Sequence, residues 1–110
     1  MGTNKRYSYV GGQRAEEREL REARKSGPLR TLDTDQLQLF TQPLTIVPEA
    51  TKLYGLAWLQ FGDQNVRCVV QVKRWTADAL GVELDIDGER LRCWIWQGAC
   101  QRLEERTAAW

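Results

Sequence analysis

The second half of the chain alternates apolar and polar residues in a way that predicts two β-hairpins. The clearer hairpin is centred on Asp87-Gly88, a dipeptide suited to a two-residue type I′ turn, which needs positive φ at both positions. This turn sets a register in which apolar residues face each other on one side and opposite charges face each other on the other. The facing pairs are Leu84 with Leu91, Val82 with Cys93 and Leu80 with Ile95 on the apolar side, and Asp85 with Arg90, Glu83 with Arg92 and Gly81 with Trp94 on the other.

A second hairpin is predicted around Gly62-Asp63, which suits a type II′ turn with glycine at its first position. On one side of this hairpin Trp58 faces Arg67, within reach of a cation–π contact. A four-residue loop keeps the same inward faces and stays open as the alternative. The inward pairs are Leu59 with Val66, Ala57 with Cys68 and Gly55 with Val70.

Further signals around the hairpins predict a fifth strand and the fold class. Arg74 falls at an inward position, so the regular alternation ends before the joint near residues 76–78. After Trp96, Gln97-Gly98-Ala99 suits a tight turn, and residues 100–103 suit a brief strand. Four strands in a meander and a fifth after a turn are the plan of a small antiparallel SH3-like barrel. An open five-stranded meander, packed by the preceding segment, is the competing arrangement.

Residues 1–30 are predicted to form a charged arm. Helix-forming Arg, Glu, Ala and Leu dominate residues 13–26, and Gly27-Pro28 supplies a stop, so we predict a helix over about 13–26 behind a flexible lead. This helix is polar nearly all round, because its apolar residues are few. Such a helix is marginal by itself, so we expect it to project into solvent or to be ordered by a partner.

Residues 31–50 are predicted to be a connecting strap ahead of a β domain over residues 51–110. Asp33 and Gln36 have the spacing of a capping box, which predicts a short helical turn. The strap is expected to lie on the body, because its apolar side chains would be poorly placed in water. Those side chains are Leu32, Leu37, Phe40 and Ile46.

Composition places the chain among small globular proteins with an uneven charge distribution. Its 110 residues allow one domain, and the 42% hydrophobic content with five tryptophans indicates that it folds. Residues 1–30 carry eight basic and four acidic side chains, a net charge of +4, while the remainder carries eight basic and eleven acidic, a net −3. A basic arm on a mildly acidic body can meet nucleic acid, an acidic partner or its own body.

Candidate chemistry is sparse. Histidine is absent, so the commonest general base and zinc ligand is missing. The three cysteines have no Cys-x-x-Cys spacing, and two of them alternate with valines in the predicted hairpins, which favours buried reduced thiols. The carboxylates of Asp85, Asp87 and Glu89 surround a turn, but without the spacing of a calcium loop. We therefore expect no enzyme activity, no cofactor and no metal, and the absence of a long apolar run predicts no membrane span.

The most informative surface feature is an outward row of Arg92, Trp94 and Trp96, flanked by the small residues Ala79 and Gly81. Exposed indoles beside arginines suit single-stranded nucleic acid, because bases stack on the rings and cations follow the phosphates. The alternative, which we favour, is that the strap or a second copy of the chain covers these rings. Residues that can extend this candidate surface are Arg67 on the other hairpin and Lys5 and Arg6 in the arm.

The chain also resembles short proteins encoded by actinobacterial phages and prophages. The resemblance lies in the Met-Gly-Thr-Asn lead, the charged helical stretch after it, and a tryptophan-rich β region at Trp75-Thr76 and Trp94-Ile95-Trp96. The absence of a signal-peptide pattern predicts the cytoplasm of the host cell as the location, with association with the virion as an alternative. The resemblance implies an origin in a phage or integrated element, which favours a role in particle assembly or in DNA handling. It carries over no reaction and no functional residues.

Two functions remain open from the sequence. The first is a non-enzymatic interaction module, related to particle assembly, that binds a protein partner or a second copy of itself. The second is a nucleic-acid accessory protein that uses the tryptophan and arginine row together with the basic arm. Salt-dependent binding of DNA distinguishes the second from the first.

Overall fold

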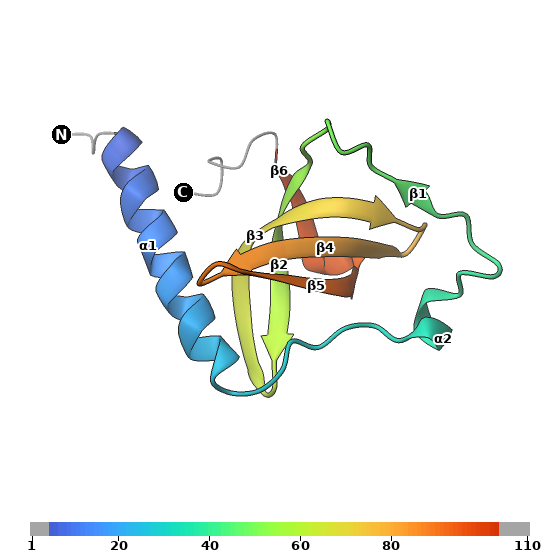
Figure 1. The fold of residues 1–110 in the computed structure, drawn as a ribbon, viewed down its shortest axis with the longest axis horizontal. Helices are drawn as coiled ribbons and strands as arrows, with labels where there is room; N and C mark the ends of the chain where they lie inside the picture. Colours follow the sequence, from blue (N-terminus) through green and yellow to red (C-terminus); the bar gives the residue numbers. More distant parts are fainter. Residues whose placement is uncertain (1–4, 104–110) are drawn as a thin grey trace.

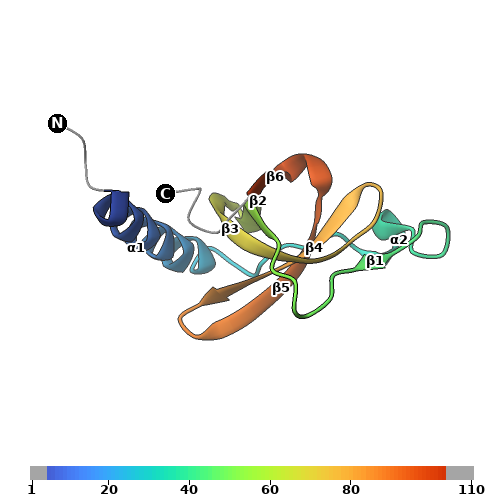
Figure 2. The same ribbon diagram turned by 90° about the horizontal axis from the view of Figure 1, so that it is seen from above.

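A computed structural model describes the backbone of residues 5–103 and the side chains of residues 14–103 (Figure 1). Residues 1–4 of the predicted flexible lead lie outside the described residues. The fold is an open antiparallel sheet of six strands with one long helix, α1 (Lys5–Arg24), at one end. Figures 1 and 2 both place α1 and the segment from α2 to β1 at opposite ends of the molecule. The other elements are α2 (Thr34–Leu37), β1 (Thr45–Ile46), β2 (Tyr54–Phe61), β3 (Gln64–Trp75), β4 (Ala79–Ile86), β5 (Glu89–Trp96), the 3₁₀ turn η1 (Gln97–Ala99) and β6 (Cys100–Leu103).

The hairpin of β4 and β5 has the predicted turn and register. Asp87 and Gly88 have φ values of 50° and 80°, so both central positions are left-handed, as a type I′ turn requires. Val82 pairs with Cys93 and Gly81 with Trp94, and the acid and base pairs follow in step. The local sequence therefore determined both the turn and the faces of the two strands.

The hairpin of β2 and β3 also has its predicted register, with Leu59 opposite Val66 and Trp58 opposite Arg67. Positive φ occurs at Gly62, at 56°, and not at Asp63, which is the pattern of a type II′ turn. The inward residues of the two hairpins form one buried core. Its strand members include Ala57, Leu59, Phe61, Val66, Cys68, Val70, Val82, Leu84, Ile86, Cys93 and Ile95.

The predicted fifth strand is β6, which follows η1 and pairs with β2. The strand order is β5-β4-β3-β2-β6, with β1 paired to β3, so β5 and β6 end the path and the sheet is open. The prediction of a closed barrel is therefore wrong, and the competing open sheet is the arrangement observed. The pairing of β3 with β4 shifts between Val72 and Arg74. The regular alternation therefore ends at this point, as the arginine at an inward position predicted.

The segment 28–32, which leads into the strap, bridges the gap between the two hairpins. At the end of β2, the amide of Gly62 donates to the carbonyl of Pro28 and the amide of Arg30 donates to the carbonyl of Gln60. At the outer edge of β5, the amide of Leu32 donates to the carbonyl of Trp94, and the amide of Trp94 donates to Thr31 Oγ1 at 2.8 Å. The segment thus occupies strand-edge groups that would otherwise be open to another chain.

The arm helix differs from its prediction in both length and position. It begins at Lys5 rather than near residue 13, because the backbone stays helical through Gly11-Gly12. Extending an existing helix by a residue adds a hydrogen bond without a new nucleation cost. The two glycines therefore lower the stability of the helix but do not end it. The helix also does not project freely, since Leu20 is 5% exposed and Ala23 is 1% exposed, both in the core. Two apolar residues one turn apart were enough to dock its second half.

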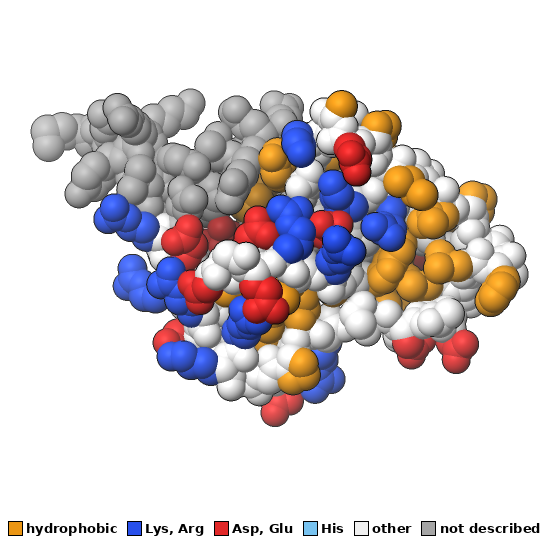
Figure 3. All heavy atoms as spheres, in the orientation of Figure 1, with side chains coloured by type: hydrophobic (Ala, Val, Ile, Leu, Met, Phe, Trp, Pro, Cys, Tyr) orange, Lys and Arg blue, Asp and Glu red, His pale blue; other side chains and the backbone are white. Residues whose placement is uncertain are grey.

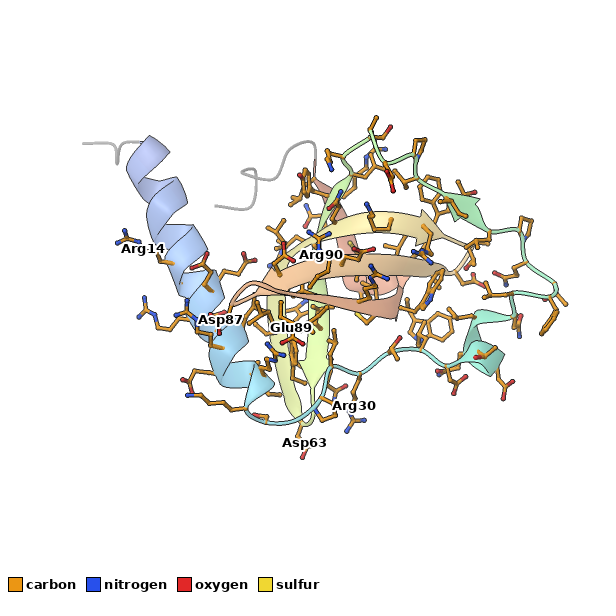
Figure 4. The ribbon with its side chains drawn as sticks, viewed as in Figure 1. Arg14, Arg30, Asp63, Asp87, Glu89 and Arg90 are labelled. Carbon is orange, nitrogen blue, oxygen red and sulfur yellow. The ribbon has the colours of Figure 1, made fainter. Side chains whose placement is uncertain are left out.

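Polar contacts attach α1 to the turn between β4 and β5 and to the middle of β3. Arg21 pairs with Asp87 at 2.7 Å and Arg24 pairs with Glu89, and Figure 4 shows the β4–β5 turn beside the helix. Glu16 accepts a hydrogen bond from the amide of Val69, which lies beyond the last paired residues of β3 and β4. The helix therefore closes the end of the sheet where the two hairpins diverge.

The strap follows its prediction only in its first half. Asp33 and Gln36 form the predicted capping box at α2, and Leu37 is buried. The second half contradicts the prediction, because Phe40 is 99% exposed and Ile46 is 68% exposed. The strap is held here by its backbone and by Val47, whose amide bonds to the carbonyl of Lys73, so these side chains stay in solvent.

Candidate partner-binding surfaces

The outer face of β4 and β5 is organised around a buried carboxylate. Glu83 has a side chain only 7% exposed, and Arg90 Nη1 lies 3.1 Å from its Oε1. Arg90 also binds Asp85 at 3.0 Å, and these hydrogen bonds raise the pKa of its guanidinium. Arg92 lies 3.8 Å from Glu83 and is 74% exposed. Two arginines thus share two carboxylates, and Arg92 is the one available to a ligand.

Trp94 and Arg74 lie on either side of Gly81 in a row across three strands. A Cβ at Gly81 would be 2.6 Å from Arg74 Cγ and 3.5 Å from the Trp94 ring, so the glycine lets both side chains lie over the sheet. Beside this row is a cavity of about 180 Å³, whose charged lining residues are Lys73, Arg74, Glu83 and Arg92. We call Lys73, Arg74, Arg92 and Trp94 the basic face. Figure 3 shows Lys and Arg side chains gathered at the centre of this view, with acidic groups among them.

The structure separates the residues that the sequence grouped into one surface. Arg92, Trp94 and Trp96 share the outer face of β5, but Trp94 is half-buried, with its backbone bound by residues 31 and 32, and Trp96 is 45% exposed. Arg67 is exposed beside Trp58 on the other hairpin. Lys5 and Arg6 lie in the backbone of α1, but their side chains fall outside the described set.

Two basic residues of this face were missed. Lys73 and Arg74 join it because the pairing of β3 with β4 shifts between Val72 and Arg74, which reverses the alternation there. A charged residue at an inward position was the available signal, since burial of an unpaired guanidinium is too costly to be the right interpretation.

The most exposed apolar surface lies on the strap. We call it the strap patch, and it consists of Leu39, Phe40, Leu44 and Ile46, which are 39%, 99%, 43% and 68% exposed. No charged residue occurs between Asp35 and Glu49. The segment is fixed to the body at several points, including Gln42 Nε2 donating to Asp78 at 2.9 Å in the turn between β3 and β4. Figure 3 shows hydrophobic side chains gathered at the end of the molecule away from α1.

The core is closed at one end and open at the other. Leu20 and Ala23 of α1 are buried in it at the closed end. Near the turn between β3 and β4 lies a cavity of about 390 Å³ that we call the open mouth. Its apolar lining comes from Leu53, Val72, Trp75 and Leu80, and its other lining residues are Tyr54, Gln97, Cys100 and Arg102.

The cysteines have the environment of packing residues. Cys68 is fully buried and Cys93 is 5% exposed, while Cys100 is partly exposed in the open mouth. Burial raises the pKa of all three thiols, that of Cys93 to about 11, so the nucleophilic thiolate is disfavoured.

Neither a metal site nor a membrane span is found in the described part of the chain. Among residues 14–103, no group of three or more Cys, Asp or Glu side chains is arranged to hold a metal ion. The three turn carboxylates Asp85, Asp87 and Glu89 each pair instead with an arginine. In the same part of the chain, none of the helices combines the length and the apolar character needed to cross a bilayer.

Comparison with protein-family models, with curated proteins and with solved structures found no match.

Proposed function

We propose that this chain is a non-enzymatic interaction module that associates with a second copy of itself through the strap patch. The observation that carries the proposal is Phe40, a large apolar side chain 99% exposed within a segment anchored on both sides. Isolated exposed apolar residues are ordinary, but four within eight positions on a fixed segment are typical of a surface that is covered in use.

The chemistry of the patch favours a second copy as the occupant. A twofold interface brings identical residues close together, so a charged patch would oppose like charges, whereas a neutral one does not. The strap patch contains only apolar and uncharged polar residues. Pro43 and Pro48 flank β1 and limit pairing of its free backbone edge, so association is expected to depend on side chains rather than on an added strand.

The resemblance to phage and prophage proteins extends the proposal to the origin and the role of the protein. Symmetric self-association suits a protein of particle assembly, made in the host cytoplasm and retained in the virion. A strand order of β5-β4-β3-β2-β6 with a 3₁₀ turn before the last strand supports an SH3-like description of the scaffold. Such a scaffold holds the patch in place without contributing chemistry.

Sedimentation equilibrium tests the proposal at micromolar to submillimolar concentrations. The wild type is expected to show a concentration-dependent dimer, and the double variant Phe40→Ser/Ile46→Thr is expected to be monomeric with an unchanged melting temperature. Trp58→Ser is the matched control, because Trp58 is 55% exposed but lies outside the patch. A monomeric wild type, or a dimer that survives loss of both patch residues, would contradict the proposal.

The basic face favours a second candidate function, single-stranded nucleic-acid binding. Lys73, Arg74 and Arg92 surround one face of a cavity beside the Trp94 ring, which is the combination of cations and aromatic surface that such ligands need. Buried Glu83 and its neighbour Asp85 offset part of this charge. The local field is therefore modest, and the function ranks second.

Fluorescence anisotropy with labelled oligonucleotides tests this second function. Binding is expected to weaken steeply between low and moderate salt, and Arg74→Ala with Arg92→Ala should reduce the salt slope by about two. Arg67→Ala serves as the control, since Arg67 is an exposed arginine on the other hairpin. Absence of binding to both single- and double-stranded DNA at low salt eliminates this function.

A further inference from the structure

We infer that each copy of the dimer inserts Phe40 into the open mouth of the other. This inference rests on the proposed self-association and names the contact that drives it. It accounts for two features of the single copy: Phe40 is an apolar side chain exposed to solvent, and the open mouth is an apolar cavity that no other described segment covers.

The open mouth has the character of a site for an apolar side chain. The other end of the core is covered, because Leu20 of α1 is buried in it. The residues Leu53, Trp75, Leu80 and Cys100 pack against the core but remain partly exposed. A cavity of about 390 Å³ is ample for a phenyl ring, and burying one would remove apolar surface on both partners.

Phe40 and the open mouth lie next to the same turn, which allows two copies to insert Phe40 into each other. Gln42, two residues after Phe40, is bound to Asp78 in the turn between β3 and β4. Trp75 and Leu80, which line the mouth, flank that turn on either side. In a twofold dimer formed about this end, Phe40 of each copy enters the mouth of the other, so that both contacts form together.

The charges around the two features are complementary. Asp33 and Asp35 are the strap's charged residues nearest to Phe40 along the sequence, so this part of the strap carries negative charge. Arg102 is exposed at the mouth and lines the cavity. Its guanidinium can pair with an acidic group of the other copy or lie against the inserted ring. The same charges favour entry of this strap over entry of a basic peptide.

Cys100 provides a way to block the mouth without changing the fold. It is the partly exposed thiol of the cavity, while Cys68 and Cys93 are buried in the core. Alkylation of the folded protein with N-ethylmaleimide is therefore expected to modify Cys100 first and to fill part of the cavity. The raised pKa of the Cys100 thiol calls for a mildly alkaline reaction.

The test measures dimerisation of four proteins by sedimentation equilibrium. We expect Phe40→Ser and the wild type alkylated at Cys100 each to dimerise about tenfold or more weakly than the untreated wild type. An equimolar mixture of the two should dimerise more tightly than either protein alone, because one supplies an open mouth and the other supplies a phenyl ring, so that one of the two contacts can form. Cys100→Ser after the same treatment is the control and should dimerise like the wild type.

The outcomes separate this inference from the proposed function. If alkylated wild type dimerises as well as untreated protein while Phe40→Ser does not, the strap patch is the interface but Phe40 does not bind in the open mouth. A mixture that dimerises no more tightly than either protein alone would also overturn the inference. If the untreated wild type is monomeric throughout, the proposed function itself fails. A second readout is the alkylation rate of Cys100, which should fall as protein concentration rises.

Discussion

Truncation of Leu20 to alanine tests whether the arm helix is part of the folded body. Leu20 is 5% exposed and belongs to the core cluster, so the substitution removes three buried carbon atoms and leaves a cavity between α1 and the sheet. Leucine-to-alanine changes in cores cost about 2–5 kcal/mol, and a site at the end of the core can partly collapse, so we expect about 2–3 kcal/mol. In a domain of this size, each kcal/mol lowers the melting temperature by about 4–8 °C.

The assay is thermal unfolding followed by near-ultraviolet circular dichroism, which reports the packing of the tryptophans. We expect Leu20→Ala to melt roughly 10 to 20 °C below the wild type. Leu39→Ala is the matched control, because Leu39 is 39% exposed on the strap, and it should change stability by less than about 0.5 kcal/mol. Equal melting temperatures for Leu20→Ala and the wild type would refute the docked helix and restore a projecting arm.

Three further predictions concern the basic face, the thiols and the attachment of the helix. Gly81→Ala places a Cβ 2.6 Å from Arg74 Cγ and should cost about 1–3 kcal/mol in thermal melts, whereas Gly98→Ala, with nothing within 4 Å, should cost little. Burial raises the pKa of Cys93 from 9.0 to about 11, so the stability that its protonated thiol contributes is full below pH 9 and is lost as pH rises toward 11. Urea titrations should therefore show a smaller loss of stability over this pH range for Cys93→Ala than for the wild type. Asp87→Asn keeps the turn but removes the half-exposed ion pair with Arg21, so it should cost less than about 1 kcal/mol and nothing at high salt.

The parts of the fold that could be predicted are those determined by neighbouring residues. Asp87-Gly88 fixes a turn geometry, and a turn geometry fixes which residues face each other along both strands. The capping box at Asp33 is likewise a contact between residues three positions apart. Each of these features requires no knowledge of the rest of the chain, and each agrees with the structure.

The parts that could not be predicted depend on contacts between distant segments. The docking of α1 needs Leu20 to meet core residues from both hairpins, and two apolar residues in a charged helix are a weak signal for it. Burial of the strap was inferred from the type of its side chains, but which of them turn inward depends on where its backbone is anchored. For the same reason, the sequence grouped the β5 residues of the candidate surface but did not add Lys73 and Arg74, which the structure places beside Arg92 and Trp94.

The position of α1 has a consequence for the order in which the protein matures. The helix is synthesised before the residues that receive it, which extend along the chain to Asp87 and Glu89. The nascent chain therefore carries Leu20 uncovered until the hairpin of β4 and β5 has emerged from the exit tunnel, and the helix can dock only then. Chaperones that bind early apolar segments have this interval in which to act, and a stalled translation product would lack the surface that completes it.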